Sequence, residues 1–170
     1  MSHHNCPDKV SILVSVGTQF SFDRMTAMVD RWLEMNQSMS NRVLMQVGPG
    51  GLLPKNAYGV ESLTPDQYHK AASTCDVLVC HAGIGSILTA AEMELPIVIV
   101  PRRYDLAEHR NDHQLSTARE FSQRKGIYVA ETEAALHQLM DDRVKLDRTQ
   151  PTQLDPGFAN HLDAFIRGPE

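Results

Sequence analysis

The stretch HAGIGS, residues 81–86, places a histidine, two glycines and a serine directly after the apolar run Val77–Cys80. Glycines allow a tight turn and let a ligand approach the backbone closely. A helix that begins in this stretch offers unpaired N–H groups and the positive end of its dipole, and phosphate groups bind well at such a position. Ser86 adds a hydroxyl donor and His81 an imidazole donor, so the stretch is typical of a diphosphate-binding turn. On spacing alone, a glycine-containing turn without a ligand explains the pattern nearly as well.

Two common nucleotide-binding motifs do not fit the sequence. A dinucleotide-binding fold has G-x-G-x-x-G after its first strand and an acidic residue at the end of its second strand. Here the first apolar run, Val10–Val16, is followed by Gly-Thr-Gln-Phe, and no acidic residue ends the second run, Val43–Val47. The sequence also lacks G-x-x-x-x-G-K-[ST], which excludes a P-loop NTPase.

A second polar segment, residues 108–114, has the sequence EHRNDHQ. His109 and His113 are four residues apart, a spacing that places two side chains on one face of a helix. A metal site is not expected, because Arg110 stands where H-E-x-x-H has its glutamate and no third ligand is evident. Recognition of a sugar or phosphate by His113 and Gln114 fits these residues better, and a solvated helix start is the alternative.

The elements that must position these residues follow from an alternation of apolar runs and segments of helical periodicity. The apolar runs predict strands at Val10–Val16, Val43–Val47, Tyr58–Val60, Val77–Cys80, Ile97–Val100 and Ile127–Ala130. The segments between them predict helices over residues 22–36, 65–74, 85–94, 111–125 and 131–140. Thr64 and Gln67 are expected to form a capping box at the second helix. This order indicates an α/β fold with a single open, parallel, Rossmann-like sheet covered by helices on both faces.

The predicted sheet also indicates where a ligand would bind. In open parallel sheets, ligands bind at the carboxyl ends of the strands, near the point where the strand order reverses. We therefore expect the functional residues in the loops Gly17–Phe20, His81–Ser86 and Pro101–Gln114.

Composition limits the classes of protein to which the chain can belong. Its 170 residues suit one domain, spanning residues 1–170, and its net charge of −5 without a basic block argues against a nucleic-acid partner. The 3 cysteines are too few for a disulfide framework or a zinc site and favour a reducing cytosol. No apolar run approaches the roughly 20 residues of a spanning helix. We expect residues 1–9 to be flexible and residues 150–170 to form a tail.

Four motifs together give the sequence a resemblance to a known family. They are SVGTQF after the first strand, HAGIGS after the fourth, ELPIVIVPR across the fifth and RNDHQ at the start of the next helix. From Val10 to about Met140, the sequence resembles the C-terminal, donor-binding half of GT-B glycosyltransferases of the family 28 type. It is similar to the small, separate catalytic subunits of that family, which act on dolichol-linked GlcNAc or in bacterial exopolysaccharide assembly.

The resemblance implies a binding site for a UDP-sugar donor. The residues that would hold the donor diphosphate are Gly17, Thr18, His81, Gly83, Gly85 and Ser86. The residues that would contact the donor sugar or its phosphate are His113 and Gln114. Gln19 and Asn111 are weaker candidates.

One position departs from the family pattern. Many relatives have a glutamate in the helix after the glycine stretch, where it binds both ribose hydroxyls. This chain has Thr89 there, and Glu92 follows three residues later. A hydroxyl forms fewer hydrogen bonds than a carboxylate accepts. Either Thr89 contacts the ribose alone, or nucleotide affinity is weak without a partner.

The implied reaction is an inverting transfer of a sugar from a UDP-sugar to a hydroxyl of a lipid-linked acceptor. No cofactor and no obligatory metal are expected. The reaction must stabilise the leaving diphosphate and deprotonate the acceptor hydroxyl. The loops described above suit the first task. The general base is expected on a membrane-anchored, acceptor-binding partner subunit with a second Rossmann-like domain, which would recruit the chain to the cytosolic face of a membrane.

The tail contains a short amphipathic pattern that the resemblance connects to this partner. Phe158, Leu162, Phe165 and Ile166 fall on one helical face. By spacing alone they would pack on the chain's own sheet, whereas the resemblance favours docking to the partner.

Other interpretations of the sequence remain. The chain could be a non-catalytic nucleotide-sugar-binding module that regulates or anchors an assembly, whereas a sugar-nucleotide epimerase of similar architecture would need a longer chain. The donor sugar is open between glucose, glucuronate and N-acetylglucosamine. Arg102 and Arg103 would suit the carboxylate of glucuronate, with a solvated loop as the alternative.

Overall fold

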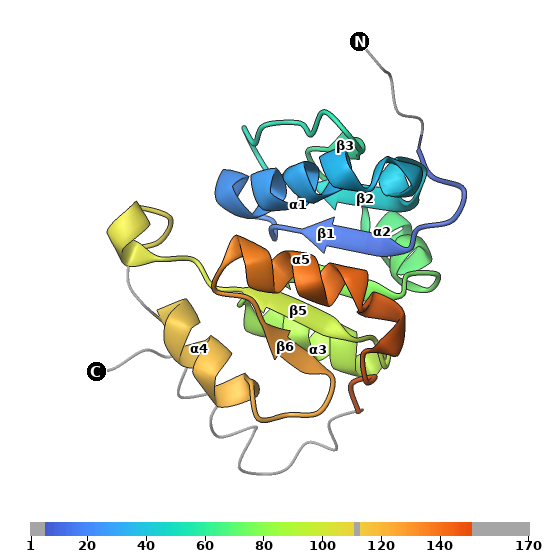
Figure 1. The fold of residues 1–170 in the computed structure, drawn as a ribbon. Coiled ribbons are helices and arrows are strands. Elements are labelled where there is room, and N and C mark those ends of the chain that lie inside the picture. The colour runs from blue at the N-terminus through green and yellow to red at the C-terminus, as the bar shows by residue number, and fades with distance from the viewer. Residues whose placement is uncertain (1–5, 111–112, 151–170) are drawn as a thin grey trace.

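The computed structural model describes residues 6–110 and 113–150. Their centre is a parallel sheet of 6 strands in the order β3-β2-β1-β4-β5-β6 (Figure 1). The strands are β1 (Ile12–Ser15), β2 (Val43–Gln46), β3 (Tyr58–Val60), β4 (Val77–His81), β5 (Ile97–Val100) and β6 (Ile127–Val129). The predicted α/β fold with one open parallel sheet is therefore confirmed.

The strands are short and apolar because both faces of the sheet are covered. All four residues of β1, of β2 and of β5 are buried. In the centre of the sheet, Ile12 of β1 is in register with Val43 of β2 and with Val77 of β4. A parallel strand buried on both faces has a continuous apolar run instead of alternating polarity, which is the pattern of the sequence.

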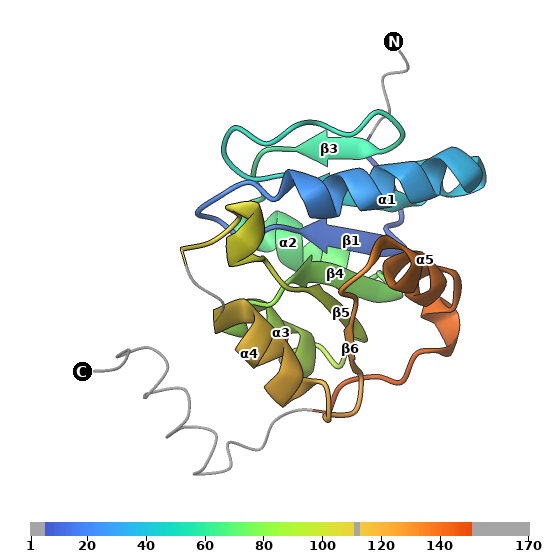
Figure 2. The same cartoon turned by 60° about the vertical axis from the view of Figure 1, so that its left-hand side comes forward.

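Among the residues that the structure describes, helices cover both faces of the sheet (Figures 1 and 2). Residues of α1 (Asp23–Met35) and α5 (Glu133–Asp141) share a core with Ile12 and Val14. Residues of α2 (Pro65–Ala72), α3 (Ile84–Glu92) and α4 (His113–Phe121) share the opposite core with Leu13 and Leu78. Short 3₁₀ segments are η1 (Gln37–Arg42), η2 (Tyr104–Leu106) and η3 (Arg143–Lys145).

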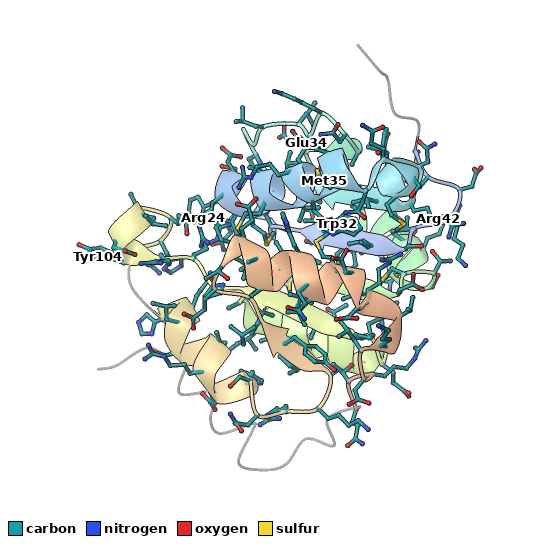
Figure 3. The ribbon with its side chains drawn as sticks, in the orientation of Figure 1. Arg24, Trp32, Glu34, Met35, Arg42 and Tyr104 are labelled. Carbon is teal, nitrogen blue, oxygen red and sulfur yellow. The ribbon has the colours of Figure 1, made fainter. Side chains whose placement is uncertain are left out.

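A tryptophan of α1 links this helix to α5 within the layer that the two helices form. Trp32 is buried on α1, and its indole N–H donates to Oδ1 of Asp141 at 2.8 Å. Figure 3 labels Trp32 beside the sheet and Tyr104 at the outer end of the η2 segment. The hydrogen bond satisfies the polar atom of a side chain that otherwise packs in the apolar core.

The start of α2 is set by local sequence. The Thr64 side chain accepts from the Gln67 N–H, and the Gln67 side chain accepts from the Thr64 N–H at 2.9 Å. The predicted capping box is therefore confirmed.

The predicted end of α4 is wrong. The helix ends at Phe121 instead of Lys125, so Gly126, a residue type that often follows a helix end, does not follow this one directly. Gly126 has φ +80°, and a Cβ there would collide with the backbone of Thr149. The conformation of Gly126 thus leaves room for the segment that contains Thr149. The Thr149 hydroxyl lies 2.8 Å from the Ala90 carbonyl and 2.8 Å from the Leu95 carbonyl.

Several predictions fall on residues that the structure does not describe. They concern Asn111, residues 1–5 and the tail residues Phe158, Leu162, Phe165 and Ile166. Among residues 6–110 and 113–150, no helix has the length and apolarity that a bilayer span requires.

Candidate functional site

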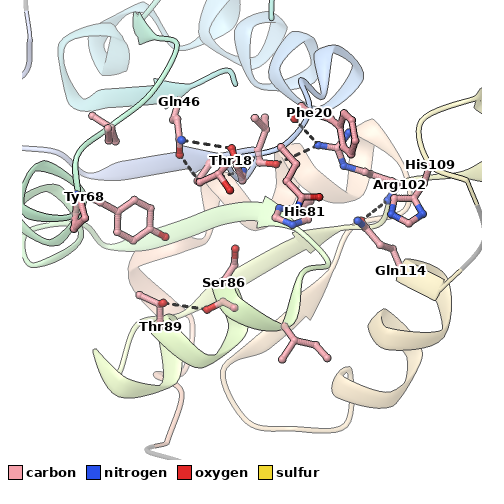
Figure 4. Close-up of a pocket in the computed structure, with 18 of the residues that line it drawn as sticks. Thr18, Phe20, Gln46, Tyr68, His81, Ser86, Thr89, Arg102, His109 and Gln114 are labelled. Carbon is pink, nitrogen blue, oxygen red and sulfur yellow. Dashed lines mark hydrogen bonds between the residues drawn. The ribbon is translucent and has the colours of Figure 1, made fainter. Parts of the chain in front are cut away.

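A pocket of about 870 Å³ opens at the carboxyl ends of the strands (Figure 4). It lies where the chain turns outward in opposite directions from β1 and β4, the point at which the strand order reverses. Its walls come from the loops after β1, β4 and β5 and from the start of α2. The predicted site residues that line it are Gly17, Thr18, Gln19, His81, Gly85, Ser86, Thr89 and Gln114.

His81 ends β4, and its ring occupies space left by two glycines. A Cβ at Gly17 would lie 2.7 Å from Cε1 of the ring, and Gly17 also has φ +87°. A Cβ at Gly83 would overlap Nε2 of the same ring. A side chain at Gly83 would therefore require the His81 ring to move, while the role of Gly83 in holding a phosphate stays a prediction.

His81 is a neutral side chain in this site. Burial, together with the nearby positive charge of Arg102, lowers the pKa of its imidazole from 6.5 to about 4. A neutral imidazole has one N–H donor and one acceptor nitrogen. Nδ1 is buried and has no hydrogen-bond partner among the residues that the structure describes. His81 can thus offer a ligand a hydrogen bond but no positive charge.

The start of α3 borders the pocket, and the first turn of a helix is a position at which anions bind well. Gly83 is its N-cap and supplies no side-chain hydrogen bond, and the first helical bond runs from the Ile87 N–H to the Gly83 carbonyl at 3.2 Å. The N–H groups before Ile87 therefore lack helical acceptors. A Cβ at Gly85 would meet no atom within 4 Å. Gly85 is the glycine whose missing side chain leaves the mouth of the helix open.

Arg102 lies under the loop that follows β1. It is 4% exposed, and its two Nη atoms donate to the carbonyls of Val16, Phe20 and Ser21 at 3.1, 2.9 and 2.6 Å. Nη2, which belongs to both bidentate forks of the guanidinium, makes two of these bonds. The fork expected to bind a glucuronate carboxylate is thus occupied, and the residue is not in a solvated loop.

Arg103, unlike Arg102, does not line the pocket. It is exposed and pairs with Asp105 at 2.6 Å. The neighbouring Glu108 instead fastens the loop after β5 to α1, because its carboxylate accepts from Nε and Nη2 of Arg24 at 2.6 and 2.9 Å. Nη2 of Arg24 also donates to the Pro101 carbonyl at 2.8 Å.

Two polar side chains at strand ends were missed by the sequence analysis. The Ser15 hydroxyl donates to Oε1 of Gln46 at 2.8 Å, and Nε2 of Gln46 lies 3.4 Å from the Gly17 carbonyl. Both residues are buried and line the pocket. A polar residue at the carboxyl end of an otherwise apolar strand was the signal that could have identified them.

The segment after β5 contributes one expected residue to the pocket, Gln114, and one that was not expected, His109. Gln114 is buried, and its Oε1 accepts from the Arg102 N–H at 3.0 Å. His113 is exposed and does not line the pocket, whereas His109 does. His109 lies in a bend before α4, so the two histidines do not share a helical face. Within the described parts of the chain, no three His, Cys, Asp or Glu residues gather to hold a metal.

The remaining wall comes from α2 and the residues just before it, and it was also missed. It contains Leu63, Pro65, Tyr68 and His69. The Tyr68 ring points into the pocket in Figure 4, and burial raises the pKa of its phenol, which stays protonated. Across from it, the Thr89 hydroxyl donates to the Gly85 carbonyl at 3.0 Å. An aromatic ring facing a hydroxyl is chemistry that suits a nucleoside.

Comparison with known proteins shows the same fold and sequence pattern. A family model described as "Glycosyltransferase family 28 C-terminal domain" matches residues 11–160. The chain is 30% identical over 126 residues to human UDP-N-acetylglucosamine transferase subunit ALG13, which covers 69% of the chain and 11% of the relative. The mouse protein of that name is 31% identical over 124 residues, with 68% and 10% covered. The chain therefore spans about a tenth of the length of these curated relatives.

Solved structures share the fold at low sequence identity. The NMR structure of ALG13 superposes with a TM-score of 0.60 at 17% identity, covering 94% of this chain and 98% of that one. The crystal structure of Acinetobacter baumannii MurG has a TM-score of 0.56 at 18% identity, covering 94% of this chain and 50% of that one. The calicheamicin glycosyltransferase CalG4 has a TM-score of 0.57 at 17% identity, with 98% and 40% covered. The expected half of a GT-B fold is confirmed.

Proposed function

Because the chain belongs to the glycosyltransferase family 28 C-terminal domain family, we propose that it is the donor-binding subunit of a glycosyltransferase that uses a UDP-sugar. The observation that carries the proposal is the uncapped start of α3 opening onto the pocket at Gly85. Helix-start N–H groups bind phosphate through hydrogen bonds and through the helix dipole.

The lining of the pocket supports one orientation of the donor. The diphosphate lies between the start of α3 and the loop after β1. The uridine lies toward α2, where Tyr68 offers an aromatic surface and Thr89 a hydroxyl for the ribose. The sugar then lies toward His109 and Gln114.

The transfer places different demands on this chain and on its partner. The acceptor oxygen attacks the anomeric carbon as the bond to the β-phosphate oxygen breaks, and UDP leaves with the bonding electrons. The N–H groups of α3 and a neutral His81 stabilise that developing charge. No carboxylate lines the pocket within the described residues. We therefore assign the general base to an acceptor-binding partner, and the relatives' name as a "subunit" supports a partner.

The donor sugar is proposed to be uncharged. Nη2 of Arg102 already serves backbone carbonyls, Arg103 is paired outside the pocket, and His81 is neutral. The relatives are named for N-acetylglucosamine transfer, which supports UDP-N-acetylglucosamine before UDP-glucuronate.

Calorimetric titration of the full chain with UDP and UDP-sugars tests donor binding. Gln114→Glu keeps an acceptor oxygen for the Arg102 N–H but adds a negative charge to the pocket wall. Across about 6 Å at an effective dielectric near 20, the repulsion of a phosphate is about 3 kcal/mol. We expect UDP affinity to fall at least tenfold, while Gln123→Glu, an exposed position outside the pocket, leaves it unchanged. Absence of UDP binding by the wild type, or equal binding by both variants, contradicts the proposal.

Co-purification tests the proposed partner interface. We propose that the tail docks a membrane-anchored acceptor subunit through Phe158, Leu162, Phe165 and Ile166. A chain carrying Phe165→Asp and Ile166→Asp should no longer co-purify with the co-expressed partner. Val144→Asp is the matched control, because Val144 is an exposed apolar residue upstream of the tail, 70% accessible. Survival of the complex in the double variant overturns this interface.

A further inference from the structure

The loop between β1 and α1 is held from below by one buried cation. Arg102 follows β5, and its guanidinium binds the carbonyls of Val16, Phe20 and Ser21 at 2.6 to 3.1 Å. A buried charge is tolerated only where hydrogen bonds replace its hydration, and the three carbonyls supply them.

Arg102 is itself fixed on two further sides. Its guanidinium carbon lies 4.5 Å from the centre of the Phe22 ring, a cation–π distance. Its own N–H donates to Oε1 of Gln114 at 3.0 Å. Arg102 thus connects the end of β5 to the loop after β1 through its side chain and to the start of α4 through its backbone N–H.

This arrangement decides which backbone groups of the loop face the pocket. Arg102 takes the carbonyls of Val16 and Phe20, and Gln46 lies 3.4 Å from that of Gly17. The N–H groups of Thr18 and Gln19 make no hydrogen bond within the described residues, and both residues line the pocket. Because the neighbouring carbonyls are taken by Arg102 and Gln46, the N–H groups of Thr18 and Gln19 remain as donors for an anion.

We propose that Arg102 is a positioning residue for the donor diphosphate, acting through the loop Val16–Ser21. The inference rests on the proposed function, because the anion it prepares for is the diphosphate of a UDP-sugar. A phosphate-binding arginine contacts the anion itself. Here the N–H groups of Thr18 and Gln19 bind the diphosphate, and Arg102 orients these groups.

NMR and titration of three variants of the full chain test the proposal. Arg102→Met removes the cation and its donors, Arg102→Lys keeps the charge without the planar fork, and Arg103→Met is the control at the adjacent exposed arginine. Without ligand, we expect the backbone order parameters of Thr18 and Gln19 to fall from about 0.85 to below about 0.6 in Arg102→Met. We expect UDP affinity to fall at least tenfold in this variant, uridine affinity to change less than twofold, and Arg103→Met to match the wild type.

The possible outcomes separate positioning from other roles. Equal losses of UDP and uridine affinity, or unchanged order parameters, overturn the proposal in favour of general structural support. Wild-type UDP affinity in Arg102→Lys also overturns it, because charge alone would then suffice. We expect the UDP affinity of Arg102→Lys to lie between those of the wild type and Arg102→Met. The lysine variant thus tests the proposal even if the methionine variant misfolds. If the wild type does not bind UDP, the proposed function fails, while the order parameters still decide whether Arg102 holds the loop.

Discussion

Gly85→Ala should stabilise the protein while weakening its binding of UDP. A Cβ at this position meets no protein atom within 4 Å, so the added methyl group causes no internal clash. Because Gly85 lies in the first turn of α3, alanine should favour the helix by up to about 1 kcal/mol. For a chain of this size, that corresponds to a rise in Tm of up to about 2–4 °C.

The same methyl group occupies the space through which a phosphate would reach the start of α3. Losing one hydrogen bond to a charged group costs about 1.5–3 kcal/mol, which lowers UDP affinity by roughly tenfold to a hundredfold. Uridine, which has no phosphate, should bind as it does to the wild type.

Thermal denaturation and calorimetric titration measure the two effects on the same samples. Ser116→Ala is a suitable control, because Ser116 is exposed on α4 and does not line the pocket. We expect this control to leave the affinity for UDP unchanged. Wild-type UDP affinity in Gly85→Ala would refute a phosphate site at the start of α3, and a lower Tm would refute the conclusion that the position is sterically free.

Three other substitutions test separate features. The pKa of His81 is lowered from 6.5 to about 4, so the unfolded chain binds the proton first as pH falls. The free energy of unfolding should therefore drop by up to about 3 kcal/mol as the pH falls from 6.5 to 4. Urea denaturation of His81→Asn should not show this drop. If the free energy of unfolding of the variant depends on pH as in the wild type, the assignment to His81 is wrong. In NMR titration, Tyr68→Ala should weaken UDP and uridine binding by the same factor, roughly threefold to tenfold, as expected for a lost aromatic contact. In the same titration, Tyr68→Phe should bind both ligands as the wild type does. A loss of affinity for UDP alone would place the uridine elsewhere. Thr64→Ala removes the capping box and should cost about 1 kcal/mol in a thermal melt, and an unchanged Tm would mean that the box contributes nothing.

Local patterns in the sequence were sufficient to predict the sheet and one helix start. Ile97–Val100 and Tyr58–Val60 are strands with the predicted bounds, because buried parallel strands need continuous apolar residues. The end of α4 was not predictable in this way. Gly126 has the residue type of a helix terminus, but its conformation is set by Thr149, which is distant in sequence.

The position of the pocket followed from topology, whereas the contacts that shape its walls join distant segments. Strand order places the loops after β1, β4 and β5 around one pocket. Arg102 and Gln46 act on the loop after β1 from other strands, and Tyr68 enters from α2. No spacing within the sequence reports such contacts, so their roles required the three-dimensional structure.

The walls of the pocket should differ in mechanical stiffness. On one side, Arg102 holds the loop after β1, and the Arg24–Glu108 ion pair joins the loop after β5 to α1. On the other side, the buried residues of α2 are only Ala71 and Ala72, which lie in its last turn. Force applied by an incoming molecule would therefore deflect the front half of α2 before it deformed these loops. A donor with a bulkier base would be accommodated, at small elastic cost, by tilting of this compliant wall, while the rigid wall keeps a constant distance to the reacting bond.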